Sequence, residues 1–248
     1  MNKHTDMKLG TRGSALALAQ ARWVKERLEA RWPDLSVELV PIRTRGDALV
    51  DTPRYQAGGK GLFLKENEEA LLRTRIDLAV HSIKDVPAEL PSGLHLAAIP
   101  EREDPRDVLL SRRGRVLDDL PAGARVGTSS LRRQAQLLAL RPDLEVVPLR
   151  GNVDTRLRKL DEGRVDAIIL AAAGVRRLGL VHRVTQFLEP QVMIPAIGQG
   201  ALGLECWQDN HRVNRLVQAL DHRDTSFAVR AERAFLRRLG GGCQVPMA

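Results

Sequence analysis

The chain breaks its regular pattern at Pro100-Glu101-Arg102-Glu103-Asp104-Pro105-Arg106, a stretch that is charged and bracketed by prolines. Such a segment is typical of an exposed crossing between two folded parts and not of a helix or strand. A second break follows at Pro195-Ala196-Ile197-Gly198-Gln199-Gly200. Two crossings predict that the chain leaves a first lobe, builds a second and returns, which gives a hinged pair of lobes with a cleft between them.

Strand and helix patterns alternate on both sides of the first crossing, which is typical of an α/β protein with a largely parallel sheet. The expected strands lie at 8–10, 37–42, 77–80 and 95–99, then at 108–111, 125–126, 145–148 and 166–170, and 201–206 returns to the first sheet. The expected helices lie at 15–31, 62–73, 131–140, 153–160, 173–178 and 226–239. We therefore expect domain 1 at 1–100 plus 200–219 and domain 2 at 105–195.

The composition limits the class of partner. Lys and Arg number 39 against 31 Asp and Glu, and the net charge of +8 favours an anionic partner. Aromatic residues make up 3% of the chain, too few for the stacking that single-stranded nucleic acid needs. No stretch is apolar for long enough to span a bilayer, and the N-terminus leads into no signal-peptide core. We expect a soluble cytoplasmic protein, a monomer, with no nucleic acid or membrane partner.

The second of two cysteines, Cys243, lies in Gly240-Gly241-Gly242-Cys243-Gln244-Val245-Pro246. Glycines leave little bulk around a thiol, so this loop favours a reachable sulfur, although a free cysteine is more often a small buried hydrophobe. Cys206 lies in an apolar run and is expected in the core. Two cysteines make no disulfide framework, which favours a reducing compartment.

Arginines follow several of the expected strands. Open α/β sheets bind ligands beyond the carboxyl ends of their strands, and guanidinium groups pair with carboxylates through two hydrogen bonds. A single arginine at a helix end is usually a solvated surface charge, but four sites at successive strand ends favour a ligand with several carboxylates. The four stretches are Thr11-Arg12-Gly13-Ser14, Gly127-Thr128-Ser129-Ser130-Leu131-Arg132-Arg133, Leu149-Arg150-Gly151-Asn152-Val153-Asp154-Thr155-Arg156 and Ala171-Ala172-Ala173-Gly174-Val175-Arg176-Arg177.

The strand at 77–80 runs into His81-Ser82-Ile83-Lys84-Asp85-Val86-Pro87. Lys84 and Asp85 either face the cleft or form an exposed ion pair of little energetic value, and His81 is expected to be structural. Gly58-Gly59-Lys60-Gly61 forms either a mobile flap or an ordinary loop. The six histidines are scattered and no glycine-rich nucleotide motif follows a strand, so neither a metal nor a nucleotide is expected.

Seven motifs in this order resemble the porphobilinogen deaminase family, also called hydroxymethylbilane synthases. Together they are colinear with the family from about Lys8 to the last residue. The motifs are Gly10-Thr11-Arg12-Gly13-Ser14-x-Leu16-Ala17-Leu18, Gly58-Gly59-Lys60-Gly61-Leu62-Phe63-x-Lys65-Glu66, His81-Ser82-Ile83-Lys84-Asp85-Val86-Pro87, Gly127-Thr128-Ser129-Ser130-Leu131-Arg132-Arg133, Leu149-Arg150-Gly151-Asn152-Val153, Pro195-Ala196-Ile197-Gly198-Gln199-Gly200 and Gly241-Gly242-Cys243-Gln244-Val245-Pro246.

The resemblance implies a transferase of tetrapyrrole (heme) biosynthesis. Such an enzyme joins four porphobilinogen molecules head to tail, releases ammonia at each step and yields hydroxymethylbilane. The resemblance also implies a dipyrromethane cofactor attached covalently to Cys243 and two lobes similar to type II periplasmic binding proteins. The family continues past the cysteine loop into a third α/β domain, whereas this sequence stops at Ala248. A truncated third domain at 221–248, carrying the cysteine loop, is therefore expected.

The motif match also implies roles for individual residues. Asp85 and Lys84 are the implied catalytic residues: Asp85 would stabilise the positive charge that forms when ammonia leaves, and Lys84 would bind a carboxylate. The implied cofactor-binding residues are Cys243, Ser82, Lys84, Asp85, Thr128, Ser129, Ser130, Arg132, Arg133, Arg150, Gly151 and Asn152. The implied substrate-binding residues are Arg12, Ser14, Arg150, Arg156, Arg177 and Gln199.

Two other classes of protein fit part of the pattern. A non-catalytic module that binds small anions, such as a solute-binding protein or the sensing domain of a regulator, shares the two lobes but does not need Cys243. A basic nucleic-acid binder would gather its arginines on one outer face and not at the ends of strands. The cysteine loop and the position of the arginines favour the enzyme.

Overall fold

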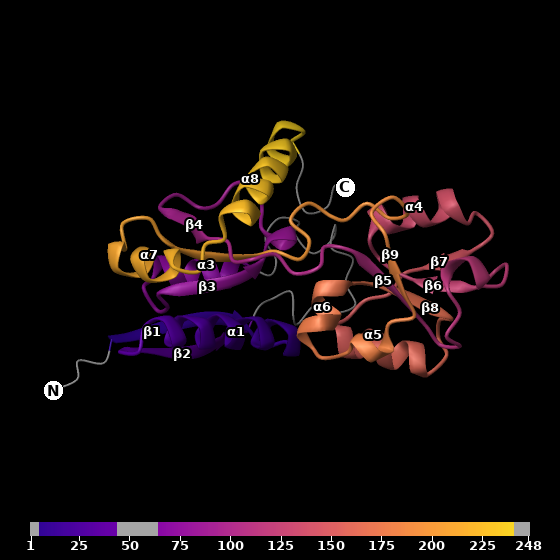
Figure 1. Cartoon of the computed structure of the whole chain (residues 1–248), viewed down its shortest axis with the longest axis horizontal. Helices are drawn as coiled ribbons and strands as arrows, with labels where there is room; N and C mark the ends of the chain where they lie inside the picture. The colour runs from indigo at the N-terminus through magenta and orange to yellow at the C-terminus, as the bar shows by residue number, and fades with distance from the viewer. Residues whose placement is uncertain (1–4, 44–63, 241–248) are drawn as a thin grey trace. The chain divides into compact units, whose positions relative to one another are not determined.

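The computed structural model describes residues 5–43 and 64–240. These residues form two compact units (Figure 1). The first unit contains the described residues up to Arg102 and those from Ala201 onward, and the second runs from Glu103 to Gly200. The chain therefore passes from one unit to the other twice.

The described part of the first unit contains a five-stranded sheet with the order β2-β1-β3-β10-β4. β1 runs parallel to β2 and β3, whereas β10 runs antiparallel to β3 and β4. The strands are β1 (Thr5–Arg12), β2 (Leu35–Ile42), β3 (Leu78–Ser82), β4 (Leu94–Ala98) and β10 (Leu202–Trp207). β10 confirms the prediction that the chain adds a strand to the first sheet after the second crossing.

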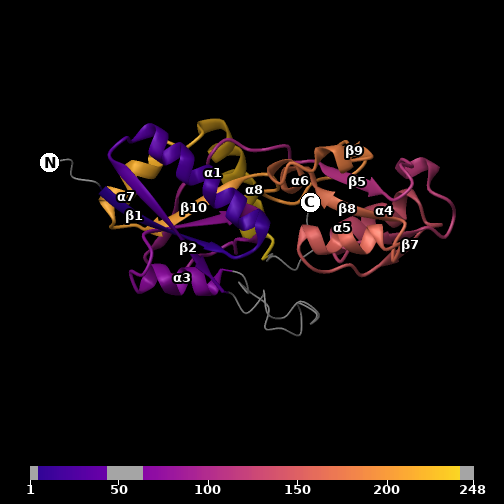
Figure 2. The ribbon, with the colours of Figure 1, turned by 90° about the horizontal axis from the view of Figure 1, so that it is seen from below.

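Helices cover both faces of this sheet (Figure 2). α1 (Ala15–Arg31) and α7 (His211–Gln218) pack on one face together with Leu78 and Val80 of β3, while α3 (Lys65–Leu72) packs on the other with Ala79. Because β3 is covered on both faces, its residues form a continuous buried run.

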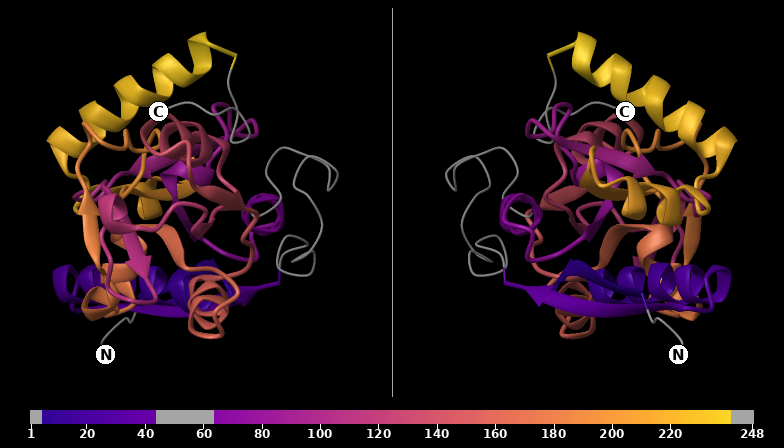
Figure 3. Two further views of the ribbon diagram at one scale, coloured as in Figure 1. Left: turned by 90° about the vertical axis from the view of Figure 1, so that its right-hand side faces the viewer. Right: turned by 90° about the vertical axis from the view of Figure 1, so that its left-hand side faces the viewer.

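The helix α8 (Arg223–Arg238) lies along the outside of the first unit (Figure 3). It buries one stripe made of Thr225, Ser226, Val229, Arg233 and Leu236. Its spacing of three and four residues is that of one helix face. A buried arginine within this stripe is unusual, because such a charge is costly to bury without partners.

The described part of the second unit also contains a five-stranded sheet, with the order β7-β6-β8-β5-β9. α4 covers one face, and α5 and α6 cover the other. The strands and helices are β5 (Asp107–Ser111), β6 (Arg125–Gly127), α4 (Leu131–Leu140), β7 (Glu145–Val147), α5 (Val153–Asp161), β8 (Ala167–Ala171), α6 (Ala172–Arg177) and β9 (Gln186–Leu188). Two short 3-10 turns, η2 (Leu117–Asp119) and η3 (Val181–Arg183), also belong to this unit. A third, η1 (Ile83–Asp85), follows β3 in the first unit.

Both described sheets are largely parallel, as predicted, because four of the five strands in each point the same way and only one strand runs against them. β10 and β5, the strands that enter a sheet from a crossing, each run antiparallel to both of their neighbours. The first residue of β10 pairs with Ser82, the last residue of β3, and the first residue of β5 pairs with Ala171, the last of β8. A chain that enters a sheet where parallel strands end has to run back against them.

The two crossing segments are hydrogen-bonded to each other. The backbone N–H of Glu103 donates to the carbonyl of Gly200 at 3.3 Å. Gly200 has a φ of +87°, and a Cβ atom at this position would lie 2.2 Å from the Glu103 carbonyl oxygen. Only glycine satisfies both the left-handed backbone and the close approach of the two segments.

Candidate active site

In the first unit, five predicted site residues lie at the ends of two neighbouring parallel strands. Arg12 ends β1 and Ser14 follows it, while Ser82 ends β3 and Lys84 and Asp85 follow in η1. Because β1 and β3 are parallel and paired, their carboxyl ends lie at the same edge of the sheet. This is the edge at which open α/β sheets bind ligands.

The two serines of this group also stabilise the local structure. The Ser14 hydroxyl accepts a hydrogen bond from the Ala17 N–H at 3.3 Å and so caps α1. The Ser82 hydroxyl accepts a hydrogen bond from the side chain of Gln20 at 3.1 Å, and Gln20 is a buried residue of α1. α1 is thus linked to both strand ends.

Lys84 and Asp85 are half-buried, and Ile83, the first residue of their turn, is fixed in the core. Ile83 is buried, and its N–H donates to the Ala201 carbonyl at 3.0 Å. Two residues before Ile83, His81 of β3 is buried, and its Nε2 lies 2.7 Å from Oε2 of Glu205. This contact is the structural kind of role that the sequence predicts for His81.

In the second unit, Thr128, Ser129 and Ser130 form the loop between β6 and α4. The Ser129 hydroxyl donates to the Leu149 carbonyl at 3.0 Å and lies 3.1 Å from the Leu149 N–H, which donates to it. The Ser130 side chain caps α4 by accepting from the Arg133 N–H at 3.5 Å. These hydroxyls therefore hold two neighbouring loops in a fixed relation.

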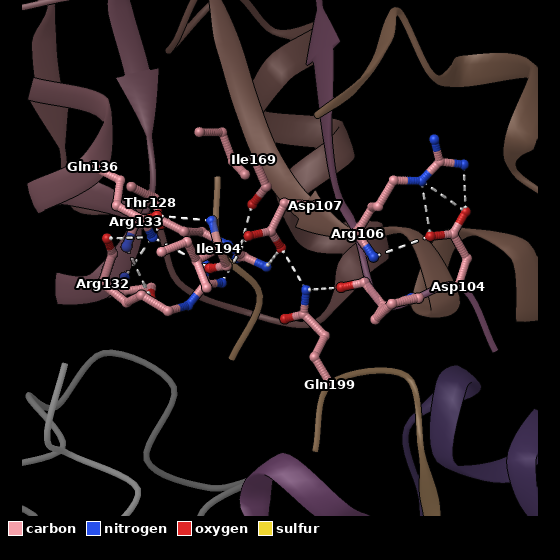
Figure 4. Close-up of polar contacts among 12 residues, drawn as sticks. Asp104, Arg106, Asp107, Thr128, Arg132, Arg133, Gln136, Ile169, Ile194 and Gln199 are labelled. Atoms are coloured by element: carbon pink, nitrogen blue, oxygen red, sulfur yellow. Dashed lines mark hydrogen bonds and ion pairs between the residues drawn. The ribbon is translucent and has the colours of Figure 1, made fainter. Parts of the chain in front are cut away.

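Arg132 and Arg133 are buried and converge on one carboxylate, that of Asp107 at the start of β5 (Figure 4). Each guanidinium group lies 2.7 Å from a different oxygen of Asp107. Arg132 also donates to the Ile194 carbonyl, and Arg133 donates to the Ile169 carbonyl at 3.0 Å. The two guanidinium groups are thus bound by Asp107 of β5, by Ile169 of β8 and by Ile194 in the segment before the second crossing.

This cluster carries an excess of positive charge, because two guanidinium groups share one carboxylate. Burial alone would raise the pKa of Asp107, but the charges and hydrogen bonds of Arg133 and Arg132 lower it to about 2. Burial lowers the pKa of Arg132, and the nearby Arg133 lowers it further, although Asp107 opposes both effects. Nε of Arg133 is buried and has no hydrogen-bond partner in the part of the chain that the structure describes.

Gln199 approaches Asp107 from the second crossing (Figure 4). Its side-chain amide donates to Oδ1 of Asp107 at 2.9 Å and to the Pro105 carbonyl at 2.6 Å. Gln199 is 1% exposed. It therefore ties the two crossing segments to the arginine cluster, and a direct contact with substrate stays a prediction.

The remaining arginines of this unit lie after β7 and β8. Arg150, Gly151 and Asn152 lead from β7 into α5, and Nε of Arg156 donates to the Gly151 carbonyl at 2.9 Å. Arg177 ends α6 and donates to the Gly200 carbonyl at 2.7 Å. Burial lowers the pKa of Arg177 to about 10, against an opposing effect of Glu103. A guanidinium that loses this much hydration is a favourable place for a ligand carboxylate.

Asp107 and Gln20 are the residues that sequence reasoning missed. Asp107 follows directly on the charged stretch 100–106 and is easily taken for one more exposed charge. The available signal was its place at the first position of the apolar run Val108-Leu109-Leu110, where a carboxylate has to be paired. Gln20 lies on a helix face among apolar residues and gave no sequence signal.

Cys243 and the glycine stretch at 58–61 lie outside the described residues. Cys206 is buried in the core of the first unit, as predicted. Burial and, to a smaller extent, the neighbouring Glu205 together raise the pKa of its thiol to about 12. A thiol in this state is not a nucleophile near neutral pH.

Residues 5–43 and 64–240 contain no group of three or more His, Cys, Asp or Glu side chains placed to hold a metal ion. Among the same residues, no helix combines the length and the apolar character needed to cross a membrane.

The fold is similar to that of solved binding proteins with two lobes. The methionine binding protein MetQ gives a TM-score of 0.54 at 16% identity, over 98% of this chain and 99% of the MetQ chain. The periplasmic VFT2 domain of BvgS from Bordetella pertussis gives a TM-score of 0.50 at 14% identity, over 92% and 93% of the two chains. These likenesses confirm the predicted fold class, that of type II periplasmic binding proteins, and at such low identity they show the fold alone.

Sequence comparison gives the family. The model of the porphobilinogen deaminase dipyrromethane cofactor binding domain matches residues 7–215, and that of the porphobilinogen deaminase C-terminal domain matches residues 226–248. The porphobilinogen deaminase of Pelobacter propionicus is 61% identical over 242 residues, which are 98% of this chain and 78% of that protein. That of Geobacter sulfurreducens is 59% identical over 242 residues, 98% of this chain and 76% of its own. The chain therefore belongs to the porphobilinogen deaminase family.

Proposed function

We propose that this protein is a porphobilinogen deaminase, which condenses four porphobilinogen molecules head to tail with release of ammonia and yields hydroxymethylbilane. The family match over residues 7–215 and 226–248 carries this proposal. The relatives at 56–61% identity all bear this name. A non-catalytic module for small anions shares the fold but is not favoured, because the family match and relatives at about 60% identity point to the enzyme.

The arginines of the second unit suit a cofactor that carries carboxylates. When bound, a dipyrromethane supplies the first two pyrrole rings onto which the product chain is built, and each ring bears an acetate and a propionate. Arg132 and Arg133 share one carboxylate, which leaves one positive charge and the Arg133 Nε donor for a ligand carboxylate. Arg150, Arg156 and Arg177 offer further guanidinium groups in the same unit. The residues present therefore fit the group.

Asp85 and Lys84 are proposed to act on the substrate. The Asp85 carboxylate would lie against the positive charge that develops on the pyrrole nitrogen of porphobilinogen when ammonia leaves, and would accept or return protons there. Lys84 would bind a substrate carboxylate and hold the ring in place. The turn that carries both side chains follows a buried strand, which limits how far they move.

Cys243 is proposed to anchor the dipyrromethane through its sulfur. Intact-mass spectrometry of protein purified from cells tests this directly, because two pyrrole units add a defined mass. We expect the adduct in the unchanged protein and its loss in Cys243→Ser. Thiol labelling is the control: buried Cys206 should stay unlabelled until the protein is denatured. An unmodified mass in protein that turns over porphobilinogen would refute the anchor.

A monomer that works in the cytoplasm completes the proposal. The two cysteines favour a reducing compartment, and the net charge of +8 favours an anionic ligand. Light scattering of the purified protein across a range of concentrations tests the monomer, and a mass that rises with concentration would contradict it.

A further inference from the structure

Arg233 of α8 makes contacts that the motifs of the sequence do not explain. It is 8% exposed, and its guanidinium group donates to three consecutive carbonyls. The distances are 3.2 Å to Val86, 2.7 Å to Pro87 and 3.3 Å to Ala88. These carbonyls begin directly after the turn that contains Lys84 and Asp85.

The segment that follows Asp85 depends on these bonds. It is irregular, and Pro87 has no N–H with which to join a sheet. Buried carbonyls without a partner cost free energy comparable to a lost hydrogen bond. A planar guanidinium group with five donors can reach several carbonyls from one position, whereas a lysine ammonium cannot reproduce that fork.

The turn is thus held from both ends by different elements. On its N-terminal side, the Ile83 N–H donates to the carbonyl of Ala201, which directly precedes β10. On its C-terminal side, Arg233 of α8 holds the carbonyls that follow Asp85. Lys84 and Asp85 are half-buried between these two attachments.

α8 is itself firmly attached to the first unit. Glu232, next to Arg233, forms a two-point ion pair with Arg102 at 2.6 and 2.7 Å. Ahead of the helix, the Asp221 carboxylate accepts from the Ile99 N–H at 2.7 Å, and the His222 N–H donates to the Ile99 carbonyl at 2.9 Å. In the sequence, α8 leads directly into the glycine stretch that contains Cys243.

We propose that Arg233 is a positioning residue that fixes the Lys84–Asp85 turn relative to the helix leading to Cys243. This inference rests on the proposed function, which gives Asp85 its role on the substrate and Cys243 its role as the anchor. Arg233 would act through the backbone of Val86 to Ala88 and would not touch the substrate. Its loss would leave substrate binding by the arginines intact but misplace the carboxylate, and a misplacement of about 1 Å costs on the order of 100-fold in rate.

The test compares Arg233→Lys and Arg233→Met with Arg230→Met, an exposed arginine of the same helix. In steady-state assays of the holoenzyme, we expect Arg233→Lys to lower kcat by about 10- to 100-fold while KM changes by less than about threefold. Arg230→Met should leave both constants unchanged. Equal losses in binding and turnover, or a normal kcat in Arg233→Lys, would overturn the proposal.

Hydrogen exchange read by mass spectrometry gives a second readout that needs no turnover. Peptides that contain residues 83–88 should exchange at least about tenfold faster in both Arg233 variants, with α8 and β10 unchanged. Exchange that rises throughout the first unit would show that Arg233 only maintains the fold, and it would refute a positioning role. If the unchanged protein fails to turn over porphobilinogen, the proposed function fails, and the exchange measurement still decides whether Arg233 holds the turn.

Discussion

Asp107 balances the charge of two guanidinium groups that are themselves buried. It is fully buried and accepts hydrogen bonds from Arg132, Arg133 and Gln199. A buried carboxylate of this kind is retained only if its partners return the cost of removing it from water. Asp107 thus fixes where the two guanidinium groups lie before any ligand binds.

Replacing Asp107 with asparagine should be strongly destabilising. Asp107→Asn leaves two buried guanidinium groups without a counter-charge, and breaking such a pair costs about 3–5 kcal/mol. Urea unfolding at pH 7 measures this loss. The pH dependence gives a second check: with a pKa of about 2 against the ordinary 3.8, Asp107 stabilises the fold above pH 4 and loses this effect as the pH falls toward 2. In Asp107→Asn, this acid-dependent loss of about 2 kcal/mol should be absent.

Asp85→Asn should nearly abolish turnover while the cofactor remains attached. The amide matches the carboxylate in size but carries no charge for the developing cation, so we expect a loss of at least about 100-fold in kcat. Steady-state assays measure turnover, and intact mass reports the cofactor. Asp209→Asn, an exposed carboxylate after β10, is the matched control. Near-normal turnover in Asp85→Asn would rule out the assigned role.

At the scale of elements, α3, β3 and β10 enclose an unusual set of titratable groups. His81 of β3 and Glu205 of β10 form a buried pair, and Glu68 of α3 lies close enough to feel both charges. Burial and, to a smaller extent, the charge of Glu205 raise the pKa of Glu68 to about 7, against an opposing effect of His81. The half-buried Glu68 therefore gains a proton more readily in the folded chain than in the unfolded one.

Glu68→Gln should change how stability depends on pH. Because folding raises the pKa of Glu68 from 4.5 to about 7, its contribution is fully favourable below pH 4.5 and is lost as the pH rises through 7. The glutamine variant should therefore be more stable than the unchanged protein at pH 8, by about 1 kcal/mol after allowance for solvent screening. The two proteins should differ less at pH 5. Urea unfolding at both pH values measures this, and equal stabilities at pH 8 would contradict it.

The elements also show what the sequence could and could not predict. Long apolar runs such as those of β8 and the expected strand at 201–206 predicted the sheets, since hydrophobic periodicity is a local property. α7 was missed although its sequence carries a local signal: Val213, Leu216 and Val217 have the spacing of one helix face, and Asn210 caps the helix. The antiparallel direction of β5 and β10 depends on where the chain re-enters a sheet, which no local pattern contains.

The candidate site, like the fold, could be predicted from the sequence only in part. Motifs predicted which arginines follow which strands, because the strand ends are local features. The partners that hold them are distant in the sequence: Asp107 for Arg132, and Arg233 for the segment after Asp85. Such pairs are set by tertiary packing and have no short-range signal.

At the scale of the whole molecule, both passages of the chain between the units depend on Gly200. Gly200→Ala combines an unfavourable φ with a clash against the Glu103 carbonyl, and we expect a loss of about 2–4 kcal/mol in the stability of the second unit. Gly179→Ala is the matched control, because Gly179 has a φ of +69° and open space where a Cβ would lie. Urea unfolding of both variants measures the difference. Equal losses of stability in the two variants would show that the clash with the Glu103 carbonyl adds nothing to the cost of the unfavourable φ.

The place of β10 in its sheet has a consequence for how the protein is made. β10 lies between β3 and β4, and it is synthesised only after all of the second unit has been translated. The second unit is one continuous stretch with its own cores, so it can fold as soon as it leaves the ribosome. Until then, β3 and β4 of the earlier-made unit present unpaired edges to the solvent, and a nascent chain in that state is the form most in need of a chaperone.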